Sequence, residues 1–308
     1  MSEYEVTRRG FLRGAAAAAG LGLLGRRAVT RAATVPFEIS LAEWSLNNET
    51  FAGKRDHLDF AKAAKQEFGL DAVEYVNQFF MDKAEDDAYI CEMKTRADGE
   101  GVRSLLIMCD REGRLGDPDE AKRAQSVENH EKWLAAAKTL GCHSIRVNAA
   151  SEGTRAEQVK LAADGLHRLS VRGEEYGLNV IVENHGGLSS DGAWLAEVMR
   201  TADHPRCGTL PDFGNFRVDE KTSYDPYKGV AEMMPFAKAV SAKTFEFDEA
   251  GNEKRVDYVK MLRIVLDAGY RGHLGIEYEG DRLEEPVGIR ATIALLERVR
   301  EELAEEYA

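Results

Sequence analysis

Eight short hydrophobic segments recur along this chain at nearly constant intervals, and this repeat restricts the fold more than any other feature. The segments are residues 37–44, 72–75, 104–109, 144–148, 179–183, 208–212, 239–243 and 274–277. Markers near their ends, from Trp44 to Glu277, lie 29 to 38 residues apart. Each segment has the composition of a β-strand and is followed by a longer stretch with helical periodicity. The spacing predicts one βα unit per interval, since such a unit takes ~30 residues.

The number of units predicts an α/β protein, a closed (β/α)8 TIM barrel that forms a single domain over residues 34–308. Such barrels usually take about 250 residues. Glycines stand where the helices are expected to end, at Gly69, Gly101, Gly141, Gly177 and Gly269. A doubly wound open sheet is the alternative, but it requires a glycine-rich phosphate loop after the first strand. Residues 44–47 read Trp-Ser-Leu-Asn and do not form such a loop.

The first 33 residues have the order of an export signal. Arg8 and Arg9 stand before Phe11 and Leu12, an apolar run fills residues 15–24, and small residues lead to Ala33. This order resembles a twin-arginine signal peptide at residues 1–33. The resemblance implies that the twin-arginine export machinery is a partner and that the protein is periplasmic or extracellular. Because the apolar run is shorter than the ~20 residues that span a bilayer, we expect no stable membrane anchor.

The charge of the chain restricts its ligands. It carries 41 Lys and Arg against 54 Asp and Glu, a formal net charge of -13. A protein this acidic is poorly suited to bind nucleic acid or an anionic membrane surface. Its four cysteines form no CxxC pair and have no zinc-module spacing. We therefore expect a small-molecule ligand and no nucleic acid partner, and the sequence leaves a homo-oligomer open.

Carboxylates follow three of the predicted strands. The active site of a TIM barrel lies at the C-terminal ends of its strands, where this sequence places Glu183, Asp212 and Glu277. Three converging acids repel one another unless a cation or shared protons compensate their charge. A divalent metal ion is the simplest compensation, and an all-oxygen ligand set favours Mg²⁺ or Mn²⁺.

Three motifs resemble those of a known superfamily. They are Val-Glu-Asn-His-Gly-Gly at residues 182–187, Leu-Pro-Asp-Phe-Gly-Asn at 210–215 and Gly-Ile-Glu-Tyr-Glu-Gly at 275–280. They resemble the xylose isomerase-like TIM barrels, which include sugar isomerases, sugar-keto epimerases, inosose dehydratases and endonuclease IV. The resemblance is strongest to the exported "sugar phosphate isomerase/epimerase" group. It implies that Glu183, Asp212 and Glu277 bind one divalent metal ion.

The sequence departs from the superfamily at two positions. Ser241 stands where the family often has a metal-binding histidine on the seventh strand, and Asn215 stands in a second histidine position. A serine hydroxyl is a weak ligand, so these two replacements lower the metal affinity that we expect. His185 is a candidate for a compensating ligand, and its glycine neighbours permit close approach to a substrate.

Positions at the predicted strand ends, together with the resemblance, suggest roles for the other candidate residues. Glu183 and Glu277 act as two bases on opposite faces of a sugar, which is what reaction through an enediolate requires. Their alternative role is an ion pair with Arg146 or Lys243. Lys243 is expected to hold the oxyanion or to act as an acid, with a structural salt bridge as its alternative. The residues predicted to bind substrate are His185, Asn148, Arg146, Glu74, Trp44 and Asn215.

The sequence thus predicts a metal-dependent sugar isomerase or epimerase that acts on a non-phosphorylated carbohydrate. A sugar lyase or dehydratase with the same site is one alternative, because it requires only a different acid position. A non-catalytic carbohydrate-binding protein that has lost its metal is another, suggested by Ser241 and Asn215. A nuclease of the endonuclease IV type is disfavoured, because the acidic chain repels DNA.

Overall fold

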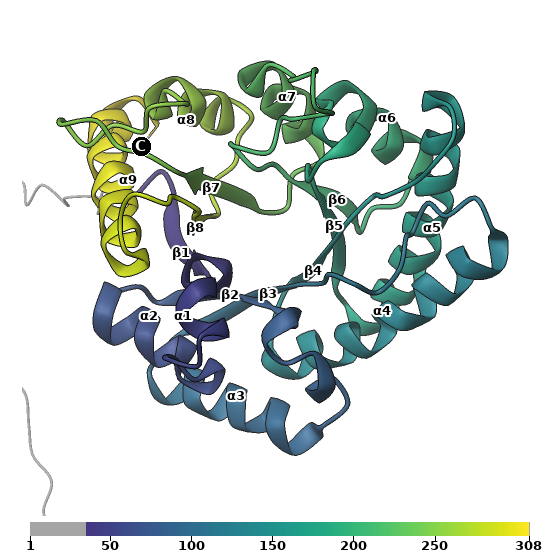
Figure 1. The fold of residues 1–308 in the computed structure, drawn as a ribbon, viewed down its shortest axis with the longest axis horizontal. Coiled ribbons are helices and arrows are strands. Elements are labelled where there is room, and N and C mark those ends of the chain that lie inside the picture. Colours follow the sequence, from purple (N-terminus) through teal and green to yellow (C-terminus); the bar gives the residue numbers. More distant parts are fainter. Residues whose placement is uncertain (1–34, 308) are drawn as a thin grey trace, which may run out of the picture. The chain divides into compact units, whose positions relative to one another are not determined.

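The computed structural model describes residues 35–307, and in this part of the chain eight parallel strands line the inside of a ring of helices (Figure 1). The strands are β1 (Glu38–Ala42), β2 (Ala72–Val76), β3 (Arg103–Met108), β4 (Ser144–Val147), β5 (Asn179–Glu183), β6 (Cys207–Leu210), β7 (Val240–Thr244) and β8 (His273–Tyr278). Each strand overlaps one of the eight hydrophobic segments of the sequence. The predicted TIM barrel is confirmed.

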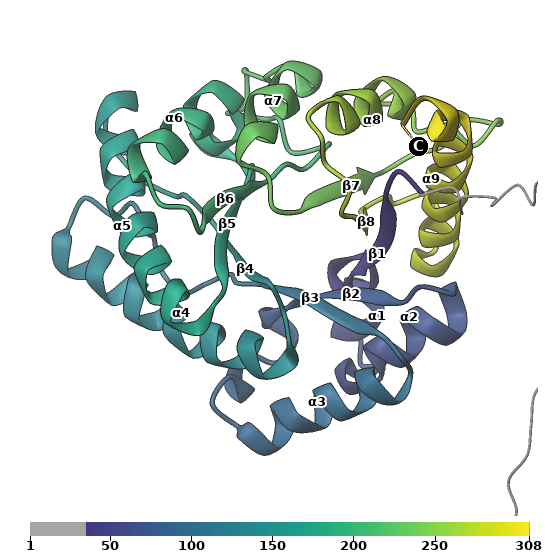
Figure 2. The same cartoon turned by 180° about the vertical axis from the view of Figure 1, so that it is seen from behind.

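The helices lie outside the strands, as the view from behind also shows (Figure 2). They are α1 (Asn47–Phe51), α2 (Phe60–Phe68), α3 (Asp87–Gly99), α4 (Glu120–Leu140), α5 (Arg155–Tyr176), α6 (Gly192–Ala202), α7 (Pro226–Met233), α8 (Tyr258–Asp267) and α9 (Glu285–Tyr307). Short 3₁₀ helices lie in the connections, among them η1 (Glu43–Leu46), η3 (Asn77–Phe79) and η5 (Gly187–Ser190). Gly69, Gly141 and Gly177 end α2, α4 and α5 in the left-handed conformation, as their positions in the sequence predicted.

The strand order identifies a barrel and not a doubly wound sheet. It runs β6-β5-β4-β3-β2-β1-β8-β7, so strands that are consecutive in the chain are neighbours and β1 pairs with β8. The remaining gap between β6 and β7 is bridged just beyond β6. Asp212 and Ser241 form an isolated parallel bridge there, in which the Ser241 amide donates to the Pro211 carbonyl at 2.9 Å. Two candidate site residues therefore lie at the seam that closes the barrel.

Side chains alternate along each strand between the outside and the inside of the barrel, so the core has two parts. Side chains that face outward pack under the helices, while inward-facing ones form a smaller apolar cluster inside the barrel. This interior cluster consists of Ala42, Val76, Leu106, Met108, Ile181, Leu210 and Ala239. Successive side chains of a strand point to opposite faces, so residues two apart share a face. Glu183 and Asp212, two positions beyond Ile181 and Leu210, thus point inward above this cluster.

The next two points concern membrane-crossing helices and the N-terminal signal. No helix within residues 35–307 is both long and apolar enough to cross a membrane. The twin-arginine signal predicted for residues 1–33 lies outside the described residues.

Candidate functional site

Three carboxylates meet at the C-terminal end of the barrel. Glu183 ends β5, Asp212 follows β6, and Glu277 belongs to β8. Their residues are 0%, 0% and 3% exposed, and one carboxylate oxygen from each lies within 4.8 Å of the other two. The strands that carry them are separated by up to about 90 residues of sequence, and closure of the barrel brings them together as the sequence predicted.

Lys243 on β7 places a positive charge beside this group of acids. Its ammonium nitrogen lies 3.7 Å from Asp212 Oδ2, 3.4 Å from Glu277 Oε1 and 3.3 Å from Glu279 Oε1. Burial on its own lowers a lysine pKa, but the neighbouring carboxylates outweigh it and raise the pKa of Lys243 well above its ordinary value. The side chain therefore carries its charge at neutral pH.

Arg146 on β4 forms the second cationic contact. Its Nε lies 2.7 Å from Glu183 Oε2, and its Nη1 donates to Asp110 Oδ1 at 2.8 Å. The side-chain amide of Asn148 donates to the same Asp110 oxygen at 2.8 Å. Asp110 thus fixes the two predicted substrate-binding residues relative to each other. The Oδ1 of Asn148 receives no hydrogen bond from any of residues 35–307, although it is buried.

Ser241 and Asn215, which stand where the resemblance leads us to expect histidines, form hydrogen bonds with the carboxylates. The Ser241 hydroxyl lies 2.7 Å from Asp212 Oδ2 and 3.0 Å from Glu277 Oε2. The side-chain amide of Asn215 donates to Glu183 Oε1 at 2.9 Å, and its backbone amide donates to Asp212 Oδ1 at 2.8 Å. Both replacements therefore hold the acids in place through hydrogen bonds.

The carboxylates carry more negative charge than their surroundings compensate. Burial raises the pKa of Glu183 and that of Asp212 to about 7, against the attraction of Arg146 and Lys243 respectively. Burial opposes ionisation of Glu277 too, but Lys243, Arg146 and the Ser241 hydroxyl outweigh it and lower its pKa. At neutral pH the group therefore attracts either protons or a further cation.

The donors fit a small divalent cation. All three are hard carboxylate oxygens, which suit Mg²⁺ or Mn²⁺. Glu183 Oε2 accepts no hydrogen bond from residues 35–307, because the Arg146 Nε–H is not aimed at it despite their separation of 2.7 Å. A buried oxygen without a hydrogen-bond donor is the kind of atom that a metal ion satisfies. The two buried cations compensate only part of the charge.

His185 lies in the loop after β5. Its residue is exposed, and its backbone amide donates to the Ser189 hydroxyl at 3.0 Å. Although the residue as a whole is exposed, crowding of the ring lowers its pKa, and the charges of Arg146 and Lys243 lower it further. The imidazole is therefore neutral at neutral pH.

The structure does not bring Glu74 to this group. Its carboxylate accepts a hydrogen bond from the Ser40 hydroxyl at 2.7 Å and lines a 340 Å³ cavity. The other residues around that cavity include His143, Asn179 and His273, from the N-terminal ends of the strands. Glu74 thus faces the opposite end of the barrel. The sequence could not show this direction, because it depends on the rotamer that the interior permits.

Trp44 lies in η1, directly after β1. Its ring packs against Phe79, with ring centroids 6.1 Å apart, and against Phe51 at 6.0 Å. Trp44 and Phe79 also pack on the interior apolar cluster. Because they follow the C-terminal ends of β1 and β2, they lie at the same end of the barrel as the carboxylates. The structure therefore puts Trp44 at the mouth of the barrel, where the sequence expected it.

Two acids of this region were absent from the sequence prediction. Asp110 follows Cys109, the predicted end of the third strand, and Glu279 stands two residues after Glu277. A search for every acid just beyond a strand end would have found both. Their partners, Arg146 and Lys243, become visible only in the folded chain.

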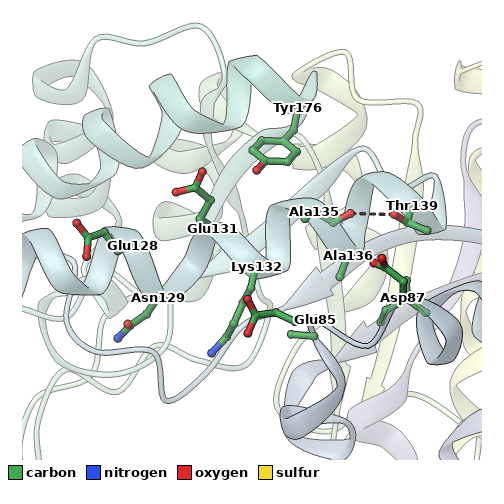
Figure 3. A pocket seen from close by; sticks show the side chains of 12 residues that line it. Glu85, Asp87, Glu128, Asn129, Glu131, Lys132, Ala135, Ala136, Thr139 and Tyr176 are labelled. Atoms are coloured by element: carbon green, nitrogen blue, oxygen red, sulfur yellow. Dashed lines mark hydrogen bonds between the residues drawn. The ribbon is translucent and has the colours of Figure 1, made fainter.

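A cleft of 620 Å³ on the outer surface is a weaker candidate site. It lies between α3 and α4, and Figure 3 shows acidic side chains along it. Two of its charged residues have partners outside the cleft, since Lys132 pairs with Glu112 at 3.0 Å and Glu131 with Arg172 at 2.6 Å. Surface ion pairs of this kind do not converge on a ligand. The carboxylates inside the barrel are therefore the stronger candidate site.

Comparison with known proteins identifies the family and the fold of the chain. A family model described as xylose isomerase-like TIM barrel matches residues 60–299. A structure of 3-keto-D-glucoside 4-epimerase from E. coli superposes with a TM-score of 0.63 at 16% identity, over 79% of this chain and 95% of that one. A xylose isomerase-like TIM barrel protein from Mycobacterium smegmatis, in complex with magnesium, gives 0.64 at 16% identity, over 88% and 98%. At such identities these likenesses show the fold alone.

A curated relative matches a short stretch of sequence. It is the C-glycoside deglycosidase alpha subunit of Arthrobacter globiformis, which is 41% identical over 49 residues. The match covers 16% of this chain and 14% of the relative.

Proposed function

Because the chain belongs to the xylose isomerase-like TIM barrel family, we propose that it is a metal-dependent sugar isomerase or epimerase. Its substrate is a non-phosphorylated sugar or sugar derivative. The observation that carries this proposal is the buried group of Glu183, Asp212 and Glu277, with carboxylate oxygens within 4.8 Å of one another. A relative in complex with magnesium and relatives named as epimerases support it.

Glu183, Asp212 and Glu277 would hold the metal ion, with the Ser241 hydroxyl at hand as a weak further ligand. A divalent cation bound there supplies Lewis acidity for a substrate carbonyl oxygen. The excess negative charge of these acids and the free Oε2 of Glu183 support this assignment.

The chain's own residues then move a proton beside the carbonyl. One of Glu183 and Glu277 accepts the proton from the carbon, and the electron pair of the C–H bond passes to the carbonyl oxygen. The other glutamate returns a proton, to the opposite face of the same carbon for epimerisation or to the neighbouring carbon for isomerisation. Lys243 stays charged, so it acts as a hydrogen-bond donor to the oxyanion and not as the acid.

Asn148 and Arg146 position the substrate. Asn148 Oδ1 is a buried acceptor without a donor, and a sugar hydroxyl satisfies it. Asp110 holds both side chains through hydrogen bonds of 2.8 Å, so they are oriented before the sugar binds. His185 contributes from the loop after β5 as a neutral hydrogen-bonding group.

The location of the proposed reaction follows from the N-terminal sequence. The twin-arginine motif at Arg8 and Arg9 would carry the folded protein out of the cytoplasm. Phosphorylated sugars are intracellular metabolites, so an exported enzyme acts on sugars that lack a phosphate group.

Exchange of carbon-bound hydrogen tests the proposal. The protein is incubated in D₂O with Mn²⁺ or Mg²⁺ and a panel of keto-sugars, aldo-sugars and keto-glycosides. We expect deuterium next to the carbonyl of at least one substrate, detected by NMR. Glu183→Gln and Glu277→Gln should each slow this exchange by about 10²-fold or more, the usual contribution of an acid–base group.

Metal content supplies the matched control. Glu183→Gln and Asp212→Asn should lose bound Mn²⁺, measured by elemental mass spectrometry, whereas Glu74→Gln should keep it. Glu74 is equally buried but lies outside the group. Exchange that is no faster with the wild type than with Glu183→Gln would overturn the enzymatic proposal. Sugar binding without exchange would favour a non-catalytic carbohydrate-binding protein, and exchange with loss of water would favour a lyase.

A further inference from the structure

The mouth of the barrel has one charged half and one aromatic half. The charged half belongs to β5, β6, β7 and β8, which carry Glu183, Asp212, Lys243 and Glu277. The aromatic half consists of Trp44, Phe51 and Phe79, which we call the aromatic cluster. Its residues follow β1 and β2, and Figure 1 shows α1 beside these strands and away from β5 and β6.

Both halves stand on the same interior surface. Trp44 and Phe79 pack on the interior apolar cluster that contains Ala42, Ile181 and Leu210. The acids of β5 and β6 stand two positions beyond Ile181 and Leu210 on the same inward face. The aromatic cluster and the carboxylates are therefore at the same level of the barrel.

Hydrogen bonds of Ser45, the residue after Trp44, hold this segment of the aromatic half beside Glu277. The Ser45 hydroxyl donates to the Ile276 carbonyl at 3.0 Å and accepts from the Tyr278 amide at 2.9 Å. These two backbone groups flank Glu277, so the turn that carries Trp44 is fixed against the strand that carries the acid. A ligand held by Glu277 thus has the Trp44 segment as its neighbour.

The aromatic cluster presents apolar ring surface to solvent. Phe51 is 58% exposed, which is high for a phenylalanine, and its ring centroid lies 4.9 Å from that of Phe79. Trp44 is half-buried. Three adjoining rings with an exposed edge form a surface on which another ring stacks favourably.

Polar groups around the aromatic cluster are already hydrogen-bonded. The Asn47 amide donates to the Trp44 carbonyl at 2.7 Å. Those of Asn77 and Gln78 donate to the carbonyl and the carboxylate of Asp110, each at 3.0 Å. Sugar hydroxyls need polar partners, and this half of the mouth offers few. The reacting sugar therefore belongs to the charged half.

We propose that the aromatic cluster is a subsite for an apolar ring attached to the substrate sugar. The substrate class is then a glycoside or another sugar that carries an aromatic substituent, rather than a free monosaccharide. The sugar ring lies among the carboxylates, and the substituent stacks on Trp44, Phe51 and Phe79. This inference rests on the proposed function for the placement of the sugar, but its test requires no turnover.

Quenching of tryptophan fluorescence by acrylamide tests the subsite. The chain has three tryptophans, and Trp133 and Trp194 are 0% and 1% exposed, so acrylamide reaches chiefly Trp44. Phenyl β-D-glucopyranoside and methyl β-D-glucopyranoside serve as probes, with the full protein in Mn²⁺. We expect the phenyl glucoside to protect Trp44 and to bind about tenfold more tightly than the methyl glucoside.

Variants separate stacking from general effects. Phe51→Ala should remove most of the preference for the phenyl glucoside, because Phe51 supplies the exposed ring. Val171→Ala, which changes an apolar side chain that is 43% exposed on α5, should leave it unchanged. Equal binding of the two glucosides, or an unchanged preference in Phe51→Ala, would overturn the subsite. Protection of Trp44 that depends on the protein concentration and not on the glucoside would also overturn the subsite. It would show that a second copy of the chain covers the aromatic cluster.

The subsite and the proposed enzymatic function can fail independently of each other. Preference for the phenyl glucoside with no deuterium exchange on any substrate would retain the subsite and reject the enzyme. Deuterium exchange on free sugars without any preference for the phenyl glucoside would retain the enzyme and reject the subsite.

Discussion

The hydroxyl of Ser241 donates a hydrogen bond to Asp212 Oδ2 at 2.7 Å, across the seam where β7 closes on β6. The same hydroxyl lies 3.0 Å from Glu277 Oε2. A serine hydroxyl has one hydrogen and can donate it to only one of the two carboxylates. A second hydrogen bond requires a proton on one carboxyl. The pKa of Asp212 is raised to about 7 by burial, whereas that of Glu277 is lowered, so Asp212 is the one of the two that takes up a proton first as the pH falls.

Metal binding should therefore release protons. Mn²⁺ needs ionised carboxylates, and burial holds the pKa values of Asp212 and Glu183 at about 7. We expect the affinity for Mn²⁺ to rise about tenfold per pH unit between pH 6 and 7 for each proton displaced, and to level off above pH 8. Titration calorimetry in buffers of different ionisation enthalpy counts the protons. An affinity that does not change with pH would contradict this coupling.

The stability of the metal-free protein should decrease as the pH rises through 7. Asp212, Glu183 and Glu74 have folded pKa values of about 7, above those of an unfolded chain. Their contribution is fully present below the unfolded pKa and is lost as the pH rises through the folded value. The slope is up to about 1.4 kcal/mol per pH unit for each proton.

Thermal unfolding between pH 6.5 and 8.5 measures this decrease, which should be steepest below pH 7 and level off above pH 8, where these carboxyls are ionised in both states. Histidines whose pKa is lowered, such as His130 and His143, act in the opposite direction, but only below about pH 6.5. Asp212→Asn should reduce the slope, and saturating Mn²⁺ should remove the contributions of Asp212 and Glu183 while leaving that of Glu74. A metal-free protein that becomes more stable from pH 7 to 8.5 would refute the assignment of these protons.

Replacing Lys243 by Met should strongly destabilise the metal-free protein. Lys243 is 1% exposed and lies within 4 Å of three carboxylates, which would be left without their cation. Removing one partner of a buried ion pair typically costs about 3–5 kcal/mol. Divalent metal should restore part of this loss, since it binds only the folded state.

Chemical denaturation with and without Mn²⁺ checks this expectation. The control is Lys254→Met, which removes a solvent-exposed pair with Glu246 at 3.0 Å and should cost less than about 1 kcal/mol. If Lys243→Met lowers the free energy of unfolding as little as Lys254→Met does, the buried ion pairs of Lys243 do not stabilise the site.

A methyl group at Gly165 should disrupt the barrel wall. A Cβ at this position in α5 would lie 1.8 Å from the Leu115 carbonyl oxygen, which is backbone and cannot move aside. We expect Gly165→Ala to lower the free energy of unfolding by more than about 3 kcal/mol, as overpacking of a core does at its upper end. Gly99→Ala in α3 meets no atom within 4 Å and should be neutral or stabilising. Equal melting temperatures for the two variants would contradict the close packing of α5 on Leu115.

Export should depend on the arginine pair near the N-terminus. In a bacterial host with the twin-arginine machinery, the wild-type chain should reach the periplasm, and Arg8→Lys/Arg9→Lys should remain in the cytoplasm. The substitution keeps both charges, so it separates receptor recognition from simple electrostatics. Cell fractionation followed by immunoblotting measures the distribution. Unchanged export of the variant would rule out this route.

The sequence alone determined the barrel and the identity of its acidic residues. Strand-forming segments repeated at about one βα unit predict the fold because hydrophobic periodicity is local and survives without knowledge of tertiary contacts. Parallel strands of a barrel end at the same face, so Glu183, Asp212 and Glu277 were predicted to converge from their positions at strand ends.

Only the tertiary structure decided which partners each side chain meets. The hydrogen bond of Ser241 to Asp212 depends on how β7 closes on β6, and that of Asn215 to Glu183 depends on how the segment after β6 lies against β5. No local pattern encodes either arrangement. The direction of Glu74, toward the far end of the barrel, depends on the space left by its neighbours. Periodicity specifies the face on which a residue lies, whereas rotamer, register and charge partner follow from packing between segments far apart in sequence.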